Sequence, residues 1–262
     1  MIFYFTGTGN SYAAALRLQE KLGGELTNIT DCMQDDKFGF DLPEDEPVGI
    51  VFPVYYGGLP SIVNDFLDHV RFSETPAYIY GVMTFGGNLM GAGWRLEQKL
   101  KSAGLSLSAD WGVKMPANYA ILYEPTHEDA AKPILEASEG RLDHIAEQIR
   151  TKQTVKEGAS IAGIALSTAS YPMYDKARKT GPFHVDDRCV SCGVCAGRCP
   201  VKAIEMRDGT PTWVKDECVF CMSCLRCNAI QYGSKLEGRY RYRHPIFKKK
   251  SAAQNTDTPS CH

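Results

Sequence analysis

Ten cysteines occur in this 262-residue chain, and eight of them lie between positions 189 and 227. The first four follow the pattern C-x2-C-x2-C-x3-C-P, and the second four follow C-x2-C-x2-C-x2-C. The other two, Cys32 and Cys261, stand alone. In a reducing compartment such short spacings are typical of metal ligands rather than of disulfides. The pattern therefore predicts a metal-binding unit toward the C-terminal end of the chain.

The first cysteine run has the spacing that bacterial ferredoxins use to hold a pair of 4Fe–4S clusters. In that arrangement three closely spaced cysteines bind one cluster, and the fourth, which precedes a proline, binds the other. Each cluster is therefore expected to take three ligands from one run and one from the other. The predicted ligands are, for the first cluster, Cys189, Cys192, Cys195 and Cys227, and, for the second, Cys218, Cys221, Cys224 and Cys199.

The two runs are followed by similar segments, as expected of a repeat: Ala203-Ile204-Glu205 and Ala229-Ile230-Gln231. The second run is nevertheless shorter before its last cysteine, and Asn228 stands where the first run has Pro200. This departure leaves open whether Cys227 completes the first cluster. Structural zinc is the alternative, but zinc sites usually place a dozen or more residues between two cysteine pairs. Two consecutive triplets favour iron–sulfur clusters.

The first part of the chain alternates short apolar runs with amphipathic stretches. Short apolar runs bounded by Gly, Pro or polar residues are typical of buried strands, and the amphipathic stretches are typical of helices. Such alternation predicts an α/β fold with a doubly wound parallel sheet. The expected strands lie at 2–5, 26–29, 49–54, 78–84 and 105–114, and the expected helices at 11–22, 60–70, 89–103 and 127–151.

A glycine-rich loop, Thr6-Gly7-Thr8-Gly9-Asn10-Ser11, joins the first expected strand to the first expected helix. Small residues let backbone N–H groups face an anion, and the helix dipole favours negative charge there. The loop adds three hydroxyl donors and has no Lys or Arg nearby in the sequence. It therefore suits a phosphomonoester held by neutral donors, and it matches neither the dinucleotide motif nor the P-loop. A plain turn with a helix cap is the alternative.

Two further loops follow the next two central strands, so all three are expected at the carboxyl ends of parallel strands, where open α/β sheets bind ligands. Tyr55 and Tyr56 are placed to flank a flat ring, and the backbone of residues 86–88 is placed to meet its polar edge. Core or surface packing of the tyrosines is the alternative. Together the loops predict an FMN pocket. Their candidate residues are Pro53, Tyr55, Tyr56, Gly57, Gly58, Phe85, Gly86, Gly87 and Asn88.

The glycine-rich loop, the P-V-Y-Y-G-G-L-P loop at 53–60 and the V-K-M-P-A-N-Y segment at 113–119 resemble the flavodoxin–ferredoxin fusions known as EFR-family ferrodoxins, or iron–sulfur flavoproteins. The likeness covers nearly the whole chain. It implies a flavodoxin-like FMN domain fused to a small α+β ferredoxin domain with two 4Fe–4S clusters, found mostly in anaerobic bacteria. By match, it carries the phosphate-binding role to Thr6, Thr8, Gly9, Asn10 and Ser11, and the ring-binding role to residues 55–58 and 85–88. The shortened second cysteine run departs from the usual pattern of this family.

The expected organisation has four parts. Residues 1–155 form the flavodoxin-like domain, 156–180 a connecting segment, 181–235 the two-cluster ferredoxin domain, and 236–262 a basic, partly disordered tail. The connecting segment is expected to be helical from Ser160 to about Lys179, with a break at Tyr171-Pro172. Basic and aromatic residues in the tail allow nucleic-acid binding as an alternative, but we favour packing over the ferredoxin domain.

No run of about 18 apolar residues is present, so no membrane-spanning helix is expected. The start, Met1-Ile2-Phe3-Tyr4-Phe5, lacks the basic residues and cleavage site of a secretory signal, and we expect a cytoplasmic protein. Residues 1–150 carry 11 Lys and Arg against 21 Asp and Glu, whereas residues 151–262 carry 18 against 10. This asymmetry predicts two units with different partners.

These features predict a protein that passes electrons between two 4Fe–4S clusters and FMN, with redox proteins or a small acceptor as partners and no nucleic acid. The alternative is an FMN-dependent reductase of a small organic acceptor, with Tyr55, Tyr56 or Tyr119 as proton donor. A third reading is a flavodoxin scaffold that binds no flavin. Electron transfer is favoured over a dedicated catalytic enzyme, and the sequence assigns no catalytic residue, redox partner or oligomeric state.

Overall fold

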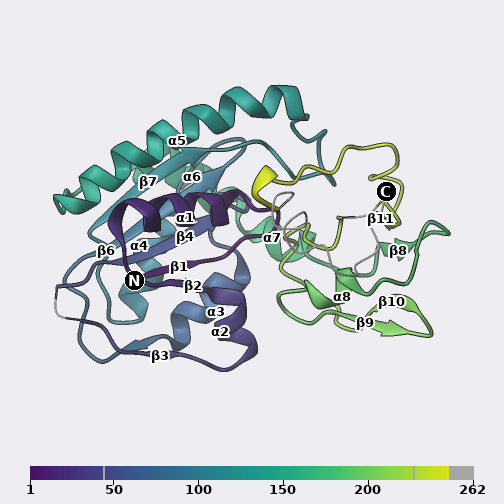
Figure 1. Cartoon of the computed structure of the whole chain (residues 1–262), viewed down its shortest axis with the longest axis horizontal. Helices are drawn as coiled ribbons and strands as arrows, with labels where there is room; N and C mark the ends of the chain where they lie inside the picture. The colour runs from purple at the N-terminus through teal and green to yellow at the C-terminus, as the bar shows by residue number, and fades with distance from the viewer. Residues whose placement is uncertain (44, 227, 248–262) are drawn as a thin grey trace.

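The computed structural model describes residues 1–43, 45–226 and 228–247 (Figure 1). Cys227, the predicted fourth ligand of the first cluster, and the lone Cys261 lie outside these described residues. Figure 1 shows a larger part, in which helices flank a sheet, beside a smaller part built from short strands and loops. Among the described residues no helix is long and apolar enough to cross a membrane.

The larger part is organised around a five-stranded sheet in the order β2-β1-β4-β6-β7. All four neighbouring pairs are parallel, and Ile2 stands opposite Leu26 on one side and Gly49 on the other. Counted along the sheet strands alone, this is the 2-1-3-4-5 order of flavodoxin-like folds. The predicted doubly wound α/β fold is confirmed. The strands are β1 (Ile2–Tyr4), β2 (Leu26–Asn28), β4 (Val48–Pro53), β6 (Ile79–Phe85) and β7 (Ala109–Lys114).

Helices cover both faces of this sheet, because connections between parallel strands cross over it. On one face, α1 (Asn10–Leu22) and α5 (Glu128–Arg150) pack against each other and onto the strands. The opposite face carries α2 (Ile29–Gln34), α3 (Ser61–His69) and α4 (Ala92–Ser102). In Figure 1, α5 and α1 lie on one side of the strands and α2 and α3 on the other. Two minor strands, β3 (Gly39–Phe40) and β5 (Arg71–Phe72), pair in parallel beyond the main sheet.

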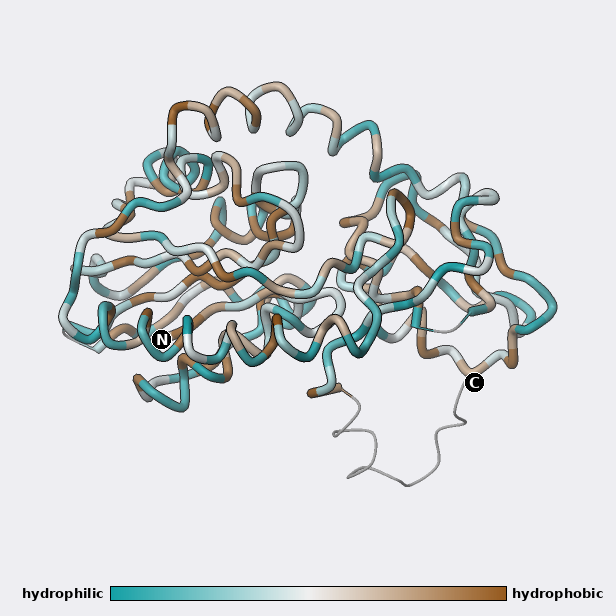
Figure 2. The backbone as a smooth tube through the Cα atoms, turned by 90° about the horizontal axis from the view of Figure 1, so that it is seen from above, coloured by the Kyte–Doolittle hydropathy of each residue, from teal (hydrophilic) through white to brown (hydrophobic). Residues whose placement is uncertain are grey.

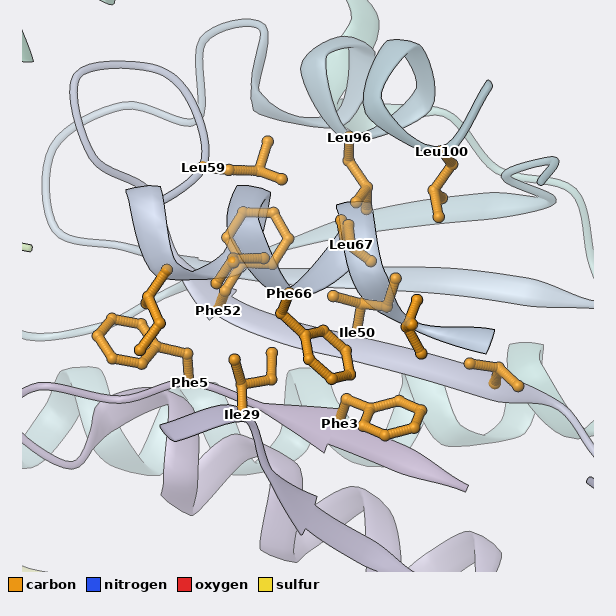
Figure 3. Close-up of a cluster of buried hydrophobic side chains, with 14 of the residues drawn as sticks. Phe3, Phe5, Ile29, Ile50, Phe52, Leu59, Phe66, Leu67, Leu96 and Leu100 are labelled. Carbon is orange, nitrogen blue, oxygen red and sulfur yellow. The ribbon is translucent and has the colours of Figure 1, made fainter. Parts of the chain in front are cut away.

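The face with α2, α3 and α4 encloses an aromatic core. The ring of Phe3 lies 4.8 Å from that of Phe40 and 5.1 Å from that of Phe66. Figure 3 shows Phe66 reaching from its helix toward Phe3 on β1, with Ile29 beside them. Figure 2 shows hydrophobic stretches running through the strands of the sheet, as expected of strands buried on both faces.

The connecting segment is helical and breaks where the sequence predicts. It comprises η1 (Glu157–Ala159), α6 (Ile161–Ser170) and α7 (Pro172–Ala177). Ser160 caps α6 by accepting a hydrogen bond from the Gly163 N–H, and the proline stands at the first turn of α7, where no backbone donor is required. The Tyr174 hydroxyl donates to the Val219 carbonyl over 2.6 Å and thereby joins the connecting segment to the second cysteine run.

The smaller part consists of two antiparallel ribbons around the cysteine runs. One pairs β8 (Phe183–Val185) with β11 (Ile230–Tyr232), and the other pairs β9 (Ile204–Arg207) with β10 (Thr210–Trp213). A short helix, α8 (Val194–Gly197), lies within the first cysteine run. This is the small α+β unit that the sequence predicts.

The described part of the tail returns to the sheet-containing part of the molecule, which the sequence did not predict. The His244 N–H donates to the Thr8 carbonyl over 2.9 Å, and the Tyr242 hydroxyl donates to Asn10 Oδ1 over 3.0 Å. Leu236 and Tyr242 are buried. The tail therefore connects the smaller part to the glycine-rich loop.

The aromatic core should dominate the stability of the larger part. Phe66 is fully buried, so Phe66→Ala is expected to lower the free energy of unfolding by about 3–5 kcal/mol. Ile161→Ala is the matched control, because Ile161 is 90% exposed and its truncation should change stability by no more than about 0.5 kcal/mol. Urea denaturation followed by circular dichroism measures both, and equal losses would contradict the assigned core.

Candidate functional site

The carboxyl ends of β1, β4 and β6 open onto one cavity of about 230 Å³. All three predicted loops contribute to its walls, together with the segment after β7. This is the edge at which open α/β sheets place their ligands. The predicted residues that line it are Thr6, Gly7, Thr8, Asn10, Ser11, Pro53, Tyr55, Tyr56, Gly57, Phe85, Gly86, Gly87 and Asn88.

Two predicted residues, Gly9 and Gly58, shape the loops without lining the cavity. Gly9 precedes α1 with φ +107°, a conformation that a side chain would strain. Gly58 exchanges both backbone hydrogen bonds with Tyr55, at 3.0 and 2.9 Å, which closes the turn that carries Tyr56. A Cβ on Gly58 would stand 2.4 Å from the ring of Tyr171 on the connecting segment.

Internal hydrogen bonds fix the polar side chains of the glycine-rich loop. Ser11 Oγ lies 2.7 Å from Thr84 Oγ1, and Asn10 Nδ2 donates to the Pro116 carbonyl over 3.0 Å. Asn118 Nδ2 donates to Thr8 Oγ1 over 2.6 Å. The loop therefore presents hydroxyls and backbone N–H groups at the first turn of a 13-residue helix, which is the donor set of a phosphate site. These residues fit the phosphate of FMN.

Other walls of the cavity are aromatic, and two of their phenol groups are in contact. The hydroxyls of Tyr56 and Tyr119 lie 2.7 Å apart. Burial, and then the hydrogen bond to Tyr56, raises the pKa of Tyr119, and burial likewise raises the pKa of Tyr55 well above its usual value. Tyr55 and Tyr119 are therefore protonated at neutral pH, so each can donate a hydrogen bond.

Sequence reasoning about loops missed much of the remaining lining. Leu122 and Tyr123 form an exposed apolar rim, and Met90 lies two residues before the first residue of α4. Three residues of the second cysteine run, Phe220, Cys221 and Met222, also line the cavity. The segment at 113–119 reaches the same edge of the sheet, so it could have indicated the rim that follows it. No sequence signal indicated the contact between the glycine-rich loop and the second cysteine run, because the two are more than 200 positions apart.

A second cavity is lined by four cysteines that the spacing rule assigns to one cluster. They are Cys199, Cys218, Cys221 and Cys224. The other walls are mostly apolar, with Ile204 and Trp213 among them. Two backbone donors already point at sulfur: the Ala203 N–H at Cys199 Sγ and the Phe220 N–H at Cys218 Sγ, both over 3.2 Å. Four thiols, dry walls and N–H···S hydrogen bonds are what a 4Fe–4S cluster requires, so these residues fit one.

Burial dominates the acid–base behaviour of these thiols. It raises the pKa of Cys218 to about 11 and that of Cys221 to about 12. Each thiol would lose its proton on ligation, since iron binds the thiolate. Cluster assembly should therefore release protons from this cavity.

The other predicted set is only partly described. Cys189, Cys192 and Cys195 are half-buried, and Cys227 lies outside the described residues. In residues 1–43, 45–226 and 228–247, no three His, Cys, Asp or Glu side chains are grouped so as to hold a metal ion. The ligands of a 4Fe–4S cluster each bind a different iron atom, so they surround a larger volume than the ligands of one ion.

The two cavities meet at Cys221, which lines both. The backbone of the glycine-rich loop touches the second cysteine run here: a Cβ on Gly7 would stand 2.0 Å from the Cys221 carbonyl oxygen. No larger residue fits at position 7 without separating the two segments. The glycine-rich loop and Cys221, a predicted cluster ligand, are thus in direct contact.

Comparisons with known proteins agree with the division of the chain into a larger, sheet-containing part and a smaller part with the cysteine runs. Residues 1–109 match the family described as flavodoxin domain, and residues 182–205 match the family described as 4Fe-4S binding domain. A ferredoxin of Clostridium butyricum is 62% identical over 26 residues, which are 10% of this chain and 47% of the ferredoxin. The match thus spans about half the length of that curated relative.

Several solved structures are also similar. A flavodoxin from the domain Archaea has 16% identity and a TM-score of 0.35, and the match covers 57% of this chain and 97% of that one. The rubredoxin oxygen:oxidoreductase of Desulfovibrio gigas has 17% identity and a TM-score of 0.33, with 58% and 36% covered. An azoreductase from Bacillus anthracis has 12% identity and a TM-score of 0.34, with 56% and 98% covered.

The chain therefore combines a flavodoxin-like domain with a 4Fe–4S ferredoxin motif.

The contact at Cys221 leads to a stability prediction. Gly7→Ala should lower the free energy of unfolding by about 1–3 kcal/mol, because the new methyl group forces a packed backbone apart. Gly197→Ala is the matched control within the first cysteine run, because a Cβ there has no neighbour within 4 Å. Anaerobic thermal unfolding compares the two variants, and a Gly7→Ala protein as stable as the control would contradict the packing described.

Proposed function

We propose that the protein transfers electrons between two 4Fe–4S clusters and FMN. The observation that supports this most strongly is that Cys221 lines both the loop cavity and the cysteine cavity. Electron transfer needs its two centres close together, and a wall shared by the two cavities supplies this condition.

The proposal gives each set of residues a binding role. The glycine-rich loop, through Thr6, Thr8 and Ser11, would hold the FMN phosphate, and the loops at 53–58 and 85–88 would hold the ring. The eight cysteines would hold the clusters, with Cys227 as the eighth ligand. When bound, clusters pass single electrons and a flavin carries one or two, so together they interconvert the two modes.

The organisation and family follow as parts of the same proposal. The domain limits would be 1–155, 156–180, 181–235 and 236–262, and the chain would belong to the EFR-family ferrodoxins, or iron–sulfur flavoproteins. A cytoplasmic location remains part of the proposal. In this scheme the connecting segment and the tail hold the two parts of the molecule together. Tyr174 of α7 contacts the sheet-containing part at Ser61, and His244 of the tail contacts it at Thr8.

Cofactor content tests the proposal directly. Anaerobically purified protein should contain about one FMN and about eight iron atoms per chain. Cys221→Ser should reduce the iron to about four atoms, because it removes a ligand of one cluster only. Cys32→Ala, at a buried cysteine in the core of the sheet, should keep about eight. Protein without flavin, or with zinc in place of iron, would refute the proposal.

A second function, reduction of a small organic acceptor, is favoured by one feature. The Tyr56–Tyr119 hydroxyl pair lines a cavity whose rim, Leu122 and Tyr123, is exposed and apolar. A planar acceptor could rest against this rim with a phenol within reach as proton donor. A shuttle between proteins has no need of such a donor.

Replacing one phenol separates the two functions. For an electron shuttle, Tyr119→Phe should change the rate of electron delivery to a protein acceptor by less than about twofold, since no proton donor is lost from that reaction. For a reductase, the same variant should slow reduction of a small acceptor by roughly 10²–10⁴-fold. Stopped-flow oxidation of reduced protein by a panel of quinone, nitro and azo compounds gives the second rate, and a loss of that size would favour the reductase.

A further inference from the structure

A third, small cavity lies behind the glycine-rich loop. Gly7 and Thr8 line it from one side while also lining the loop cavity on the other, so the loop is a shared wall. The facing walls carry four arginines from three separate segments. Arg198 comes from the first cysteine run, Arg226 from the second, and Arg241 and Arg243 from the tail. We call this space the arginine cavity.

The positive charge in the arginine cavity is not balanced by its own walls. No Asp or Glu is among the described residues that line it. Arg226 Nη1 and Arg243 Nε are buried and have no hydrogen-bond partner among the described residues. Burial, and then the neighbouring Arg198, lowers the pKa of Arg243. Arg198 is exposed and Arg226 and Arg243 are half-buried, and like charges whose buried nitrogens lack acceptors favour a nearby anion.

The tail places these charges against the loop through contacts of its own. The His244 N–H binds the Thr8 carbonyl, and the Phe247 ring stacks on Tyr12 of α1, with centroids 6.0 Å apart. The guanidinium of Arg198 lies over the same Phe247 ring, 5.7 Å from its centroid. Burial lowers the pKa of His244 to about 4, so this imidazole is neutral at pH 7 and the arginines alone supply the charge.

The anion that this position suits is the phosphate on the other side of the loop. The loop offers only neutral donors, and a phosphomonoester there would carry up to two negative charges. Gly7 and Thr8 line both cavities, so the loop itself is the wall between the two. Charges act more strongly across a wall that excludes water than through bulk solvent.

We propose that Arg198, Arg226 and Arg243 make the flavin site selective for the phosphorylated flavin, by stabilising the FMN phosphate across the Gly7–Thr8 backbone. This inference rests on the proposed function, since it assumes that the loop cavity binds FMN. Riboflavin has the same ring without the phosphate, so the arginines should give its binding no advantage. The arginines do not line the loop cavity, so they act on the phosphate through the loop as positioning residues and do not touch the flavin.

Titration of two flavins tests the proposal. Cluster-loaded protein stripped of flavin is titrated anaerobically with FMN and with riboflavin, and the quenching of flavin fluorescence gives each Kd. Arg243→Gln and Arg226→Gln should each weaken FMN binding roughly tenfold and change riboflavin binding by less than about twofold. Arg243→Lys, which keeps the charge, should retain most of the preference for FMN.

Arg207→Gln is the matched control, because Arg207 is an exposed arginine on β9 outside the arginine cavity. It removes the same charge and should leave both Kd values within about twofold of wild type. Iron content is measured for every variant, so that loss of the fold is recognised.

Four results would overturn the inference. Equal weakening of FMN and riboflavin would make the arginines structural supports of the loop. An unchanged FMN Kd with shifted cluster reduction potentials would assign their charge to the clusters instead. Wild-type protein that binds no FMN would overturn this inference and the proposed function together, whereas FMN binding with an unaltered preference would overturn this inference alone.

Discussion

The close approach of Gly7 to the Cys221 carbonyl is the contact on which the rest of the structure depends. It brings the loop after β1 against a cysteine run more than 200 positions later, with no space for a Cβ between them. The loop cavity and the cysteine cavity share a wall at this contact, formed by Phe220, Cys221 and Met222. The connecting segment, through Tyr174, and the tail, through His244, also hold the smaller part against the sheet-containing part.

Charge and polarity are divided sharply around this contact. The loop side offers hydroxyls and amides, the cysteine side offers thiols in apolar walls, and the arginine cavity behind both concentrates positive charge. Two of these environments favour an anion: the arginine cavity, where Arg226 Nη1 and Arg243 Nε are buried without acceptors among the described residues, and the N-terminus of α1 at the loop cavity. A phosphate bound at the loop would serve both.

Much of this could be predicted from the sequence, because local patterns encode it. The alternation of apolar runs predicted the sheet, and each loop at its carboxyl edge could be placed from strand order alone. The spacing rule grouped Cys199 with Cys218, Cys221 and Cys224, and the same four line one cavity. The arginines could not be foreseen: the loop has none near it in sequence, and only the fold of the tail brings Arg243 behind Thr8. Contacts of such range leave no periodic signal.

The most direct test of the account is the order of the reaction that reduces the flavin. Protein with all cofactors bound is mixed anaerobically with a limiting one-electron donor, and cluster and flavin absorbance are followed by stopped flow at several protein concentrations. If the two centres meet at Cys221, electrons pass within one chain, and the rate constant of the step from cluster to flavin is independent of protein concentration. A rate that rises in proportion to protein concentration, or clusters that stay reduced beside oxidised flavin, would contradict the account.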